Sequence, residues 1–349
     1  MAMTIVEAAP GVTGGVDTHL DAHVAAALDP LGRLIGTESF AADAGGYKAL
    51  FAWLEGFGQV TKVGIEGTGS YGVGLTRFLR RRGIEVVEVN RPNRQARRNH
   101  GKSDPLDAIE AARAALSGRA SGAGKTKSGP VEAIRVLVVA KRSARQARVK
   151  ALVQMRHLGF TAPEQLHCRL KGLTVTELIK EGTKLRPTRS TDPVTAATKA
   201  SLSSLAHRVQ ALDVEIAELD EKIRSLLFAT APDLLALFGV GPDTAAALLV
   251  AAGDNPERLH SEAAWAHLCG VSPIPADSGK SAWHLRHHKG GDRQANAALW
   301  RIVMVRIAHD PETTAYFERR VKEGRTKRDV IRILKRYVAR EVYRYLPRG

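Results

Sequence analysis

The strongest pattern in the chain is a run of apolar residues between positions 202 and 226 that recur at alternating steps of three and four. The eight positions are Leu202, Leu205, Val209, Leu212, Ile216, Leu219, Ile223 and Leu226. This heptad spacing draws one apolar stripe along a continuous helix, and a partner helix must cover such a stripe. We predict a coiled coil here, paired with a helix expected over 131–159, with a second copy of the chain, or with both.

The N-terminal part has a different pattern, in which short apolar runs of strand length precede and alternate with helical segments. Three runs within 14–40 predict consecutive strands, and two later runs at 60–66 and 84–89 predict two more. Helices are expected over 46–56 and 71–82, between these strands. Three strands followed by alternating helices and strands indicate a mixed α/β sheet with helices against its faces.

Four acids stand out in this α/β region. Asp17 and Glu66 lie at the ends of adjacent apolar strands, whereas Asp104 and Asp107 open the next helix, with Asp104 near the N-cap and Pro105 at the first helical position. A ribonuclease-H-like sheet gathers carboxylates in this way, and hard oxygen ligands suit Mg²⁺ or Mn²⁺. The alternative is that each acid serves only in a turn or a helix cap.

The charge of the chain indicates a polyanionic partner. Its 349 residues include 52 Lys and Arg against 36 Asp and Glu, a formal net charge of +16, which favours nucleic acid. A dense arginine tract lies between 77 and 102, and further cationic stripes follow the helices expected over 293–309 and 325–345. Solvated helix faces are the alternative interpretation of these residues.

Other features limit the classes of protein that the chain can belong to. Cys168 and Cys269 lack the spacing of a disulfide framework or a cysteine zinc site, and no apolar run approaches the roughly 20 residues of a membrane span. No signal peptide is visible, so we expect a cytoplasmic protein. The GAGKT stretch lacks the full phosphate-loop spacing and a preceding strand, and the 117–130 segment is therefore expected to be a linker rather than an NTPase loop.

The rest of the chain gives weaker signals. Residues 161–193 are expected to be irregular and 271–288 to form a polar loop. The glycines around 239–241 precede a helix and predict a helix–hairpin–helix-like element, with a plain helix–turn–helix as the alternative. The tryptophans Trp265, Trp283 and Trp300 are expected in the core, and His284, His287 and His288 in phosphate contacts or on the plain surface rather than in a zinc site.

Several of these segments together resemble a known family. GVDTHLDAHVAAALDPLGRLIG, GIEGTGSYG, KSDPLDA, FGVGPDTAAALLVAAGD, AAWAHLCGVSPIPADSGKS and HHKGGDRQANAAL occur in order along the chain. They are similar to motifs of the DEDD-type transposases of the one-hundred-and-ten insertion-sequence family, the bridge-RNA-guided recombinases. The resemblance covers most of the chain, although the coiled-coil region matches only in character.

The resemblance implies a fold, a mechanism and partners. It implies a RuvC-like metal domain over 1–120, a linker and coiled coil over 121–231, and a mainly helical transposase domain over 232–349. The four acids would hold Mg²⁺ or Mn²⁺, and a serine would be the nucleophile: Ser278 at the matching position, with Ser272 and Ser281 as neighbouring alternatives. The partners would be donor and target double-stranded DNA, a structured guide RNA and further copies of the chain, as a dimer or tetramer near the bacterial nucleoid.

Three functions remain in competition at this point. The first is a DNA recombinase that acts through a serine nucleophile, the second a RuvC-type metal-dependent junction endonuclease without a covalent intermediate, and the third a non-enzymatic RNA-binding protein. In the first two, the residues expected to contact nucleic acid are Arg77, Arg80, Arg81, Arg91, Arg94, Arg97, Arg98, Lys102, Lys280, Arg286, Arg293, Arg328, Arg332, Lys335 and Arg336.

Overall fold

The computed structural model describes residues 11–89, 103–120, 122, 124–187, 192–255, 259–275, 285–288 and 290–347, with the backbone alone for 285–287. The chain divides into two units. The sheet unit comprises Met1–Gly129, Ala252–Trp265 and Arg348–Gly349, and the helical unit comprises Pro130–Ala251 and Ala266–Pro347. In the described part of the chain, no helix is long and apolar enough to cross a bilayer.

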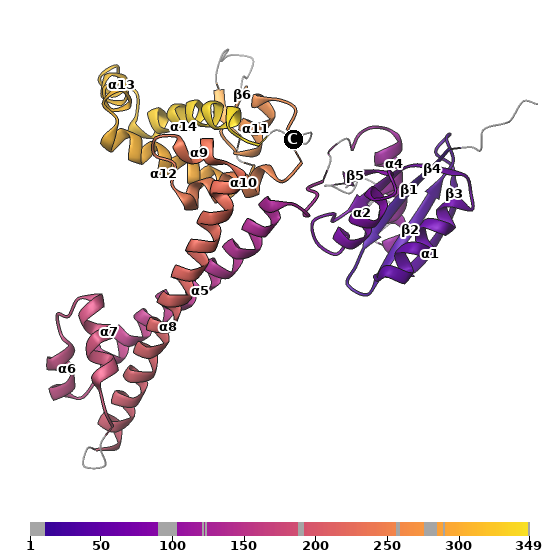
Figure 1. Ribbon diagram of the computed structural model, residues 1–349. Helices are drawn as coiled ribbons and strands as arrows, with labels where there is room; N and C mark the ends of the chain where they lie inside the picture. The colour runs from indigo at the N-terminus through magenta and orange to yellow at the C-terminus, as the bar shows by residue number, and fades with distance from the viewer. Residues whose placement is uncertain are drawn as a thin grey trace, which may run out of the picture. The chain divides into compact units, whose positions relative to one another are not determined.

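The sheet unit contains a five-stranded mixed sheet, as the sequence predicts (Figure 1). Its strands are β1 (Gly11–Thr18), β2 (Ala22–Leu28), β3 (Leu34–Ala41), β4 (Gln59–Glu66) and β5 (Glu85–Val89), in the spatial order β3-β2-β1-β4-β5. The first three pair antiparallel, whereas β4 and β5 run parallel to β1. Two parallel neighbours at the centre of the sheet thus end at the same edge.

Helices cover both faces of this sheet. On one face, α1 (Ala44–Glu55) and α2 (Val73–Arg80) bury Leu50, Leu54, Leu75 and Leu79 against β1 and β4. On the other face lies α4 (Asp104–Leu116), which contacts β1, β2 and β4. The alternation of side chains along a strand assigns each residue of β1 to one of these two faces.

Glycines in β1 and β4 let α4 approach the sheet very closely. Gly15 pairs with Gly64 in the parallel register. A Cβ on Gly15 would lie 2.2 Å from the carbonyl oxygen of Ala108 and from the amide nitrogen of Ala112, and a Cβ on Gly64 would lie 2.4 Å from the carbonyl oxygen of Ala111. The helix backbone therefore rests directly on the strands, which fixes the position of its first turn relative to the strand ends.

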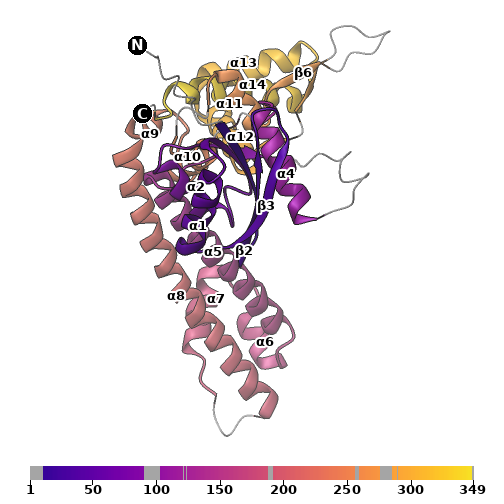
Figure 2. The same cartoon turned by 90° about the vertical axis from the view of Figure 1, so that its right-hand side faces the viewer.

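The helical unit is organised by two long helices, α5 (Pro130–Phe160) and α8 (Pro193–Thr230), which lie side by side in Figures 1 and 2. Leu202, Val209 and Ile223 of the heptad stripe are buried, whereas Leu212 and Ile216 are half-buried. Ion pairs also join the two helices, Arg148 to Asp213 and Lys141 to Asp220.

The prediction of irregular structure over 161–193 is wrong, because α6 (Glu164–Leu170) and α7 (Val175–Lys184) form there. Helix α7 starts with a capping box, in which Thr174 accepts from the Glu177 amide and Glu177 accepts from the Thr174 amide. Leu170 and Leu178 then pack into the core between α5 and α8. The Thr-x-x-Glu signal was legible in the sequence.

The last third of the chain is mostly helical, as predicted. Its helices are α9 (Pro232–Ala236), α10 (Pro242–Ala252), α11 (Glu262–Leu268), α12 (Arg293–His309), α13 (Pro311–Lys322) and α14 (Lys327–Arg344). A turn with Gly239 in the left-handed region joins α9 to α10. The expected polar loop over 271–288 instead contains a pair of short antiparallel strands, β6 (Pro273–Pro275) and β7 (Leu285–His287).

Candidate metal centre and nucleic-acid surface

Two of the predicted acids lie at the shared edge where β1 and β4 end. Val16 of β1 pairs with Ile65 of β4, so the next residues, Asp17 and Glu66, are neighbours across the two strands. Each lies two positions after a glycine that contacts α4, and strand alternation therefore directs both side chains to the α4 face. The Thr18 hydroxyl donates to the Glu66 carbonyl oxygen over 2.7 Å and ties the strand ends together.

The other two acids come from the start of α4. The N-cap is Ser103, which has an extended backbone and makes no side-chain capping bond, so Asp104 and Pro105 lie one position further into the helix than predicted. Asp107 is buried, whereas the Asp104 carboxylate is about half exposed at 49%. Acids in a first helical turn are favoured by the positive end of the helix dipole.

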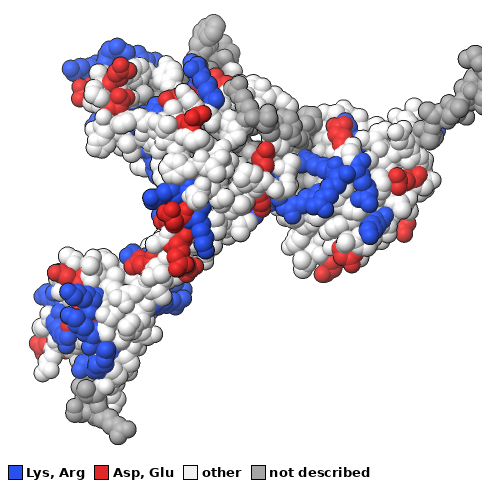
Figure 3. All heavy atoms as spheres, in the orientation of Figure 1, with Lys and Arg blue, Asp and Glu red and all other residues white. Residues whose placement is uncertain are grey.

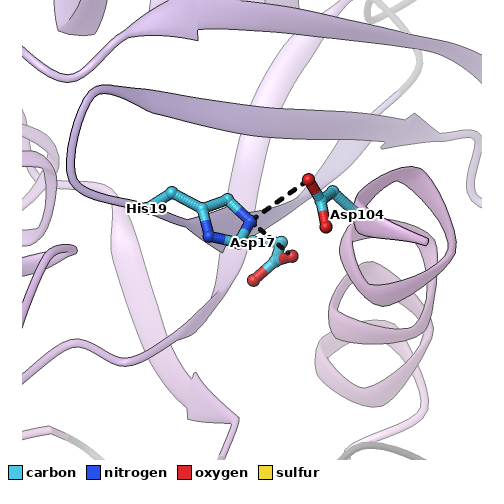
Figure 4. A group of neighbouring side chains, drawn as sticks. All are labelled: Asp17, His19 and Asp104. Atoms are coloured by element: carbon cyan, nitrogen blue, oxygen red, sulfur yellow. Dashed lines mark hydrogen bonds and ion pairs between the residues drawn. The ribbon is translucent and has the colours of Figure 1, made fainter. Parts of the chain in front are cut away.

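A histidine that the sequence analysis did not select joins this cluster. His19 Nε2 lies 3.1 Å from Asp17 Oδ2 and 3.4 Å from Asp104 Oδ2 (Figure 4). One ligand atom from each of Asp17, His19 and Asp104 lies within 4.8 Å of the others, and this is the group of potential metal ligands found among the described residues. The signal for His19 was its position two residues after Asp17, in the turn between β1 and β2.

The electrostatics of the cluster favour a cation. Burial raises the pKa of Asp17 above its ordinary value; His19 opposes that shift, while Asp107 and Asp104 add to it. The ionised form of Asp17 is therefore disfavoured until positive charge is supplied. Carboxylate oxygens with one imidazole nitrogen form a donor set that fits a divalent metal ion.

The predicted nucleic-acid residues of the sheet unit have distinct surroundings. Arg77 donates to the Lys127 carbonyl oxygen, and Arg80 donates to the Gly124 carbonyl oxygen over 3.0 Å, so both hold the segment that follows α4. Arg81 is exposed. Figure 3 shows Lys and Arg gathered on the face of the sheet unit that is turned toward the viewer. Arg91, Arg94, Arg97, Arg98 and Lys102 lie outside the described residues.

In the helical unit, the predicted residues Arg293, Arg328, Arg332, Lys335 and Arg336 lie on α12 and α14. Arg286 lies on β7, where only the backbone is described. Exposed cations that the sequence analysis did not select also occur around α6 and α7 (Figure 3), namely Arg169, Lys171, Lys180, Lys184 and Arg186.

The predicted serine nucleophile lies in a part of the chain that the structure does not describe. Ser278, its neighbour Lys280 and the alternative Ser281 all fall within 276–284, the segment that connects β6 to β7. Ser272 is described and precedes β6, where its carbonyl oxygen accepts from the His288 amide over 3.1 Å. The assignment of the nucleophile therefore stays a prediction.

Comparison with known proteins finds matches to transposase families in both units. Residues 14–158 match the DEDD-type IS110 family model, described as a transposase, and residues 231–318 match the model described as the transposase IS116/IS110/IS902 family. Together these matches cover about two thirds of the chain.

Individual relatives agree with these matches. The chain is 30% identical over 137 residues to the insertion element IS900 uncharacterized 42 kDa protein of Mycobacterium paratuberculosis, covering 39% of this chain and 34% of that protein. It is 31% identical over 136 residues to the insertion element IS110 uncharacterized 43.6 kDa protein of Streptomyces coelicolor, covering 38% and 33%. The alignments thus span about a third of the length of these relatives.

Proposed function

The chain belongs to the IS110 family of transposases, and from this premise we propose that it cuts and exchanges DNA strands through a serine nucleophile assisted by a carboxylate-bound divalent metal. The observation that carries the proposal is the convergence of Asp17, His19 and Asp104 at the end of β1, with the charge of Asp107 acting on Asp17. In a chain with a net charge of +16, acids concentrated at one strand edge favour the binding of a cation there.

The proposed metal ligands are the acids Asp17, Glu66, Asp104 and Asp107, with His19 as an additional ligand or as a hydrogen-bond partner of the carboxylates. A bound Mg²⁺ or Mn²⁺ would supply Lewis acidity toward a phosphate oxygen. The donor set is mainly carboxylate, which suits these two ions better than softer metals. The raised pKa of Asp17 means that protons compete with the metal at a higher pH than at an ordinary aspartate.

In the proposed chemical step, the Ser278 hydroxyl oxygen attacks a DNA phosphorus atom. The Oγ–P bond forms, the bond from phosphorus to one sugar oxygen breaks, and that oxygen leaves as a hydroxyl after taking up the proton that the serine loses. A free serine hydroxyl is a weak nucleophile, so the step needs a proton acceptor and positive charge beside the phosphate. Attack by a sugar hydroxyl on the phosphoserine link reverses the step and rejoins strands.

Membership of the family also supports proposals on the fold, the partners, the location and the oligomeric state of the protein. The strand order and the acids at the central strand ends are consistent with a RuvC-like domain, and the paired helices α5 and α8 are consistent with a coiled coil. The net charge of +16 suits two polyanionic partners, DNA and a structured guide RNA that selects the sites. Such a protein would act near the bacterial nucleoid, as a dimer or tetramer.

A cleavage assay tests the proposal directly. Purified protein is mixed with Mg²⁺, the flanking non-coding RNA and labelled DNA, and a protein-linked DNA band is sought on a denaturing gel. We expect an adduct that disappears with Ser278→Ala and with EDTA. Ser272→Ala and Ser281→Ala are the matched controls and should keep the adduct.

Other outcomes would contradict the proposal in distinct ways. Cut DNA without an adduct would indicate a metal-dependent junction nuclease in which water is the nucleophile. An adduct that survives Ser278→Ala and disappears with Ser281→Ala would move the nucleophile by three residues. An intact activity after Asp104→Ala and Asp107→Ala would leave the acids a structural role only.

A further inference from the structure

A groove of about 720 Å³ lies between α12 and α14 in the helical unit. The wall formed by α12 carries Arg293, Asn296 and Trp300, and the wall formed by α14 carries Arg328, Arg332 and Lys335. Each set recurs at helical spacing, so each helix turns one continuous stripe toward the groove. We call this feature the α12/α14 groove.

The α12/α14 groove is strongly cationic. Four of its lining residues are Arg or Lys, and Asp292 is the acid among them. The Asp292 carboxylate caps α12, where it accepts from the Gln294 and Ala295 amides over 2.8 and 3.0 Å. Its charge is thus engaged by the end of the helix. Arg332 pairs with Asp329 over 2.9 Å, and the surplus positive charge of Arg293, Arg328 and Lys335 favours an anionic ligand.

One of the cations is held in a defined position. Lys335 is half-buried, and its Nζ donates to Asn296 Oδ1 over 2.9 Å. The Asn296 amide nitrogen donates in turn to the carbonyl oxygens of Cys269 and Gly270, over 2.8 and 3.2 Å. Among the described residues, Lys335 has this amide and no carboxylate as its partner. The ammonium group is therefore fixed in place without being neutralised.

The groove also presents an aromatic surface. The prediction that Trp300 lies in the core is wrong, because 47% of the residue is exposed on the groove wall, whereas Trp265 is fully buried as expected. Exposing an indole forgoes the favourable burial of a large apolar surface. An exposed tryptophan among cations is the combination by which proteins bind unpaired nucleotides, through base stacking and phosphate contacts.

We propose that the α12/α14 groove holds an unpaired nucleotide of a DNA strand, with the base stacked on Trp300 and the phosphate contacted by Lys335, Arg328 and Arg332. A volume of this size suits one or two nucleotides, and a paired base could not offer its face to the wall. The inference rests on the proposed function only for the choice of DNA as the polymer.

The position of the groove along the chain supports the choice of DNA as the polymer. His288 lines the groove and directly follows β7, whose residue His287 pairs with Pro273 of β6. Gly270, on the same rim, lies three residues before β6. The base of the hairpin whose connecting segment carries Ser278 is thus also a rim of the groove. The groove is therefore adjacent in the chain to the segment that is proposed to attack DNA.

The test measures the binding of a fluorescent single-stranded 12-nucleotide DNA to the full-length protein by anisotropy, in EDTA so that no cleavage occurs. Trp300→Ala should weaken binding by about 5- to 150-fold, the range for loss of one stacked base, and Trp300→Phe should retain most of the affinity. Because Trp300 is exposed, both variants should keep the circular dichroism spectrum of the wild-type protein.

A pair of charge variants separates groove contacts from general attraction. The double variant Arg328→Ala, Arg332→Ala should reduce the slope of log affinity against log salt by about 1.4, from two lost phosphate contacts. The control double variant Arg208→Ala, Arg224→Ala removes the same charge from exposed positions on α8 and should leave the slope unchanged. A photo-crosslink from 5-iodo-deoxyuridine should map to Trp300.

Three results would overturn the inference: wild-type affinity in Trp300→Ala, an equal loss for fully paired duplex DNA, or a ribonucleotide 12-mer that binds more tightly through Trp300 than the DNA does. The outcome is separable from that of the proposed function. A Trp300-dependent DNA complex without any serine adduct would remove the proposed chemistry alone, and a Ser278 adduct with no Trp300 dependence of binding would remove the groove assignment alone.

Discussion

The candidate metal centre of the sheet unit and the α12/α14 groove of the helical unit are constructed in opposite ways. In the candidate metal centre, the backbone sets the geometry, because α4 rests on Gly15 and Gly64 and thereby brings its first turn to the strand ends. In the groove, long side chains project from two helices, and hydrogen bonds among Lys335, Asn296 and the Cys269 carbonyl give it order.

This difference predicts how each site responds to substitution. A site set by backbone contacts cannot relax around an added atom, and its buried like charges lower stability until a cation is bound. A site set by exposed side chains loses one contact at a time and keeps its fold.

The largest effect is expected from Asp17→Asn, measured as the rate of DNA cleavage in Mg²⁺. Since a metal ion contributes several kcal/mol to the stabilisation of a transition state, loss of this ligand should slow cleavage by about 10³-fold. Asp21→Asn removes the same charge from an exposed neighbour and should leave the rate unchanged.

The same variant should not unfold the protein. The folded-state pKa of Asp17 is raised above 3.8, so its ionised form costs stability once the pH rises through that pKa, and this cost is present at pH 7. The neutral amide removes the cost. The free energy of unfolding without metal should therefore equal or exceed that of the wild-type protein, and a lower value would assign Asp17 a structural role.

The second prediction concerns the backbone contact itself. Gly15→Ala places a Cβ at 2.2 Å from two backbone atoms of α4, which cannot move aside as a flexible side chain would. We expect a loss of about 3 kcal/mol in the free energy of unfolding, measured with urea. Gly122→Ala is the matched control, because its Cβ would meet no atom within 4 Å. Equal stability of the two variants would refute a site set by the backbone.

The contrast also explains why the sequence predicted one site better than the other. Acids at the ends of adjacent parallel strands must lie at one edge of the sheet, whatever the loops between them do. The apolar runs that end at Asp17 and Glu66 therefore sufficed to predict that these two acids lie at one edge of the sheet. His19 was missed because a histidine in a turn is common, and its approach to Asp104 depends on how closely α4 packs.

The groove had no comparable sequence signal. Trp300 falls within a helix where an inward and an outward position look alike in a sequence so rich in alanine and arginine, and its exposure depends on where α14 packs. The short strands β6 and β7 likewise gave no sequence signal, because three residues are too few for a periodic pattern, and two of the three residues of β6 are prolines. Helix α7 could have been predicted from its Thr174–Glu177 capping box.

The third prediction turns to the groove and expects a small effect on stability. Burial lowers the pKa of Lys335, with Arg332 adding to the shift, so the charged form costs stability at every pH below the ordinary lysine value of 10.5. Lys335→Met should raise the free energy of unfolding at pH 7 by no more than about 1 kcal/mol, since solvent screens a half-buried charge. DNA affinity should fall in the same variant. A marked loss of stability would show that this groove, too, is structural.

The smallest effect separates the two units by their response to acid. His23 is buried in β2 and stacks on Tyr47 with ring centroids 5.6 Å apart, and burial lowers its pKa below 6.5, with His19 adding to the shift. A lowered pKa means that the stability of the fold is fully present above pH 6.5 and is lost as the pH falls through the folded-state value. His23→Phe keeps a ring against Tyr47 and removes the titration.

Urea unfolding at pH 7.5 and pH 5.0 measures this difference. The wild-type protein should lose about 0.5 kcal/mol more between these pH values than His23→Phe does. His207→Phe, at an exposed position on α8 in the helical unit, is the control and should keep the wild-type dependence. If the two variants lost stability in parallel, the acid sensitivity would not originate in the packed interior of the sheet unit. The sheet unit would then respond to acid no differently from the helical unit.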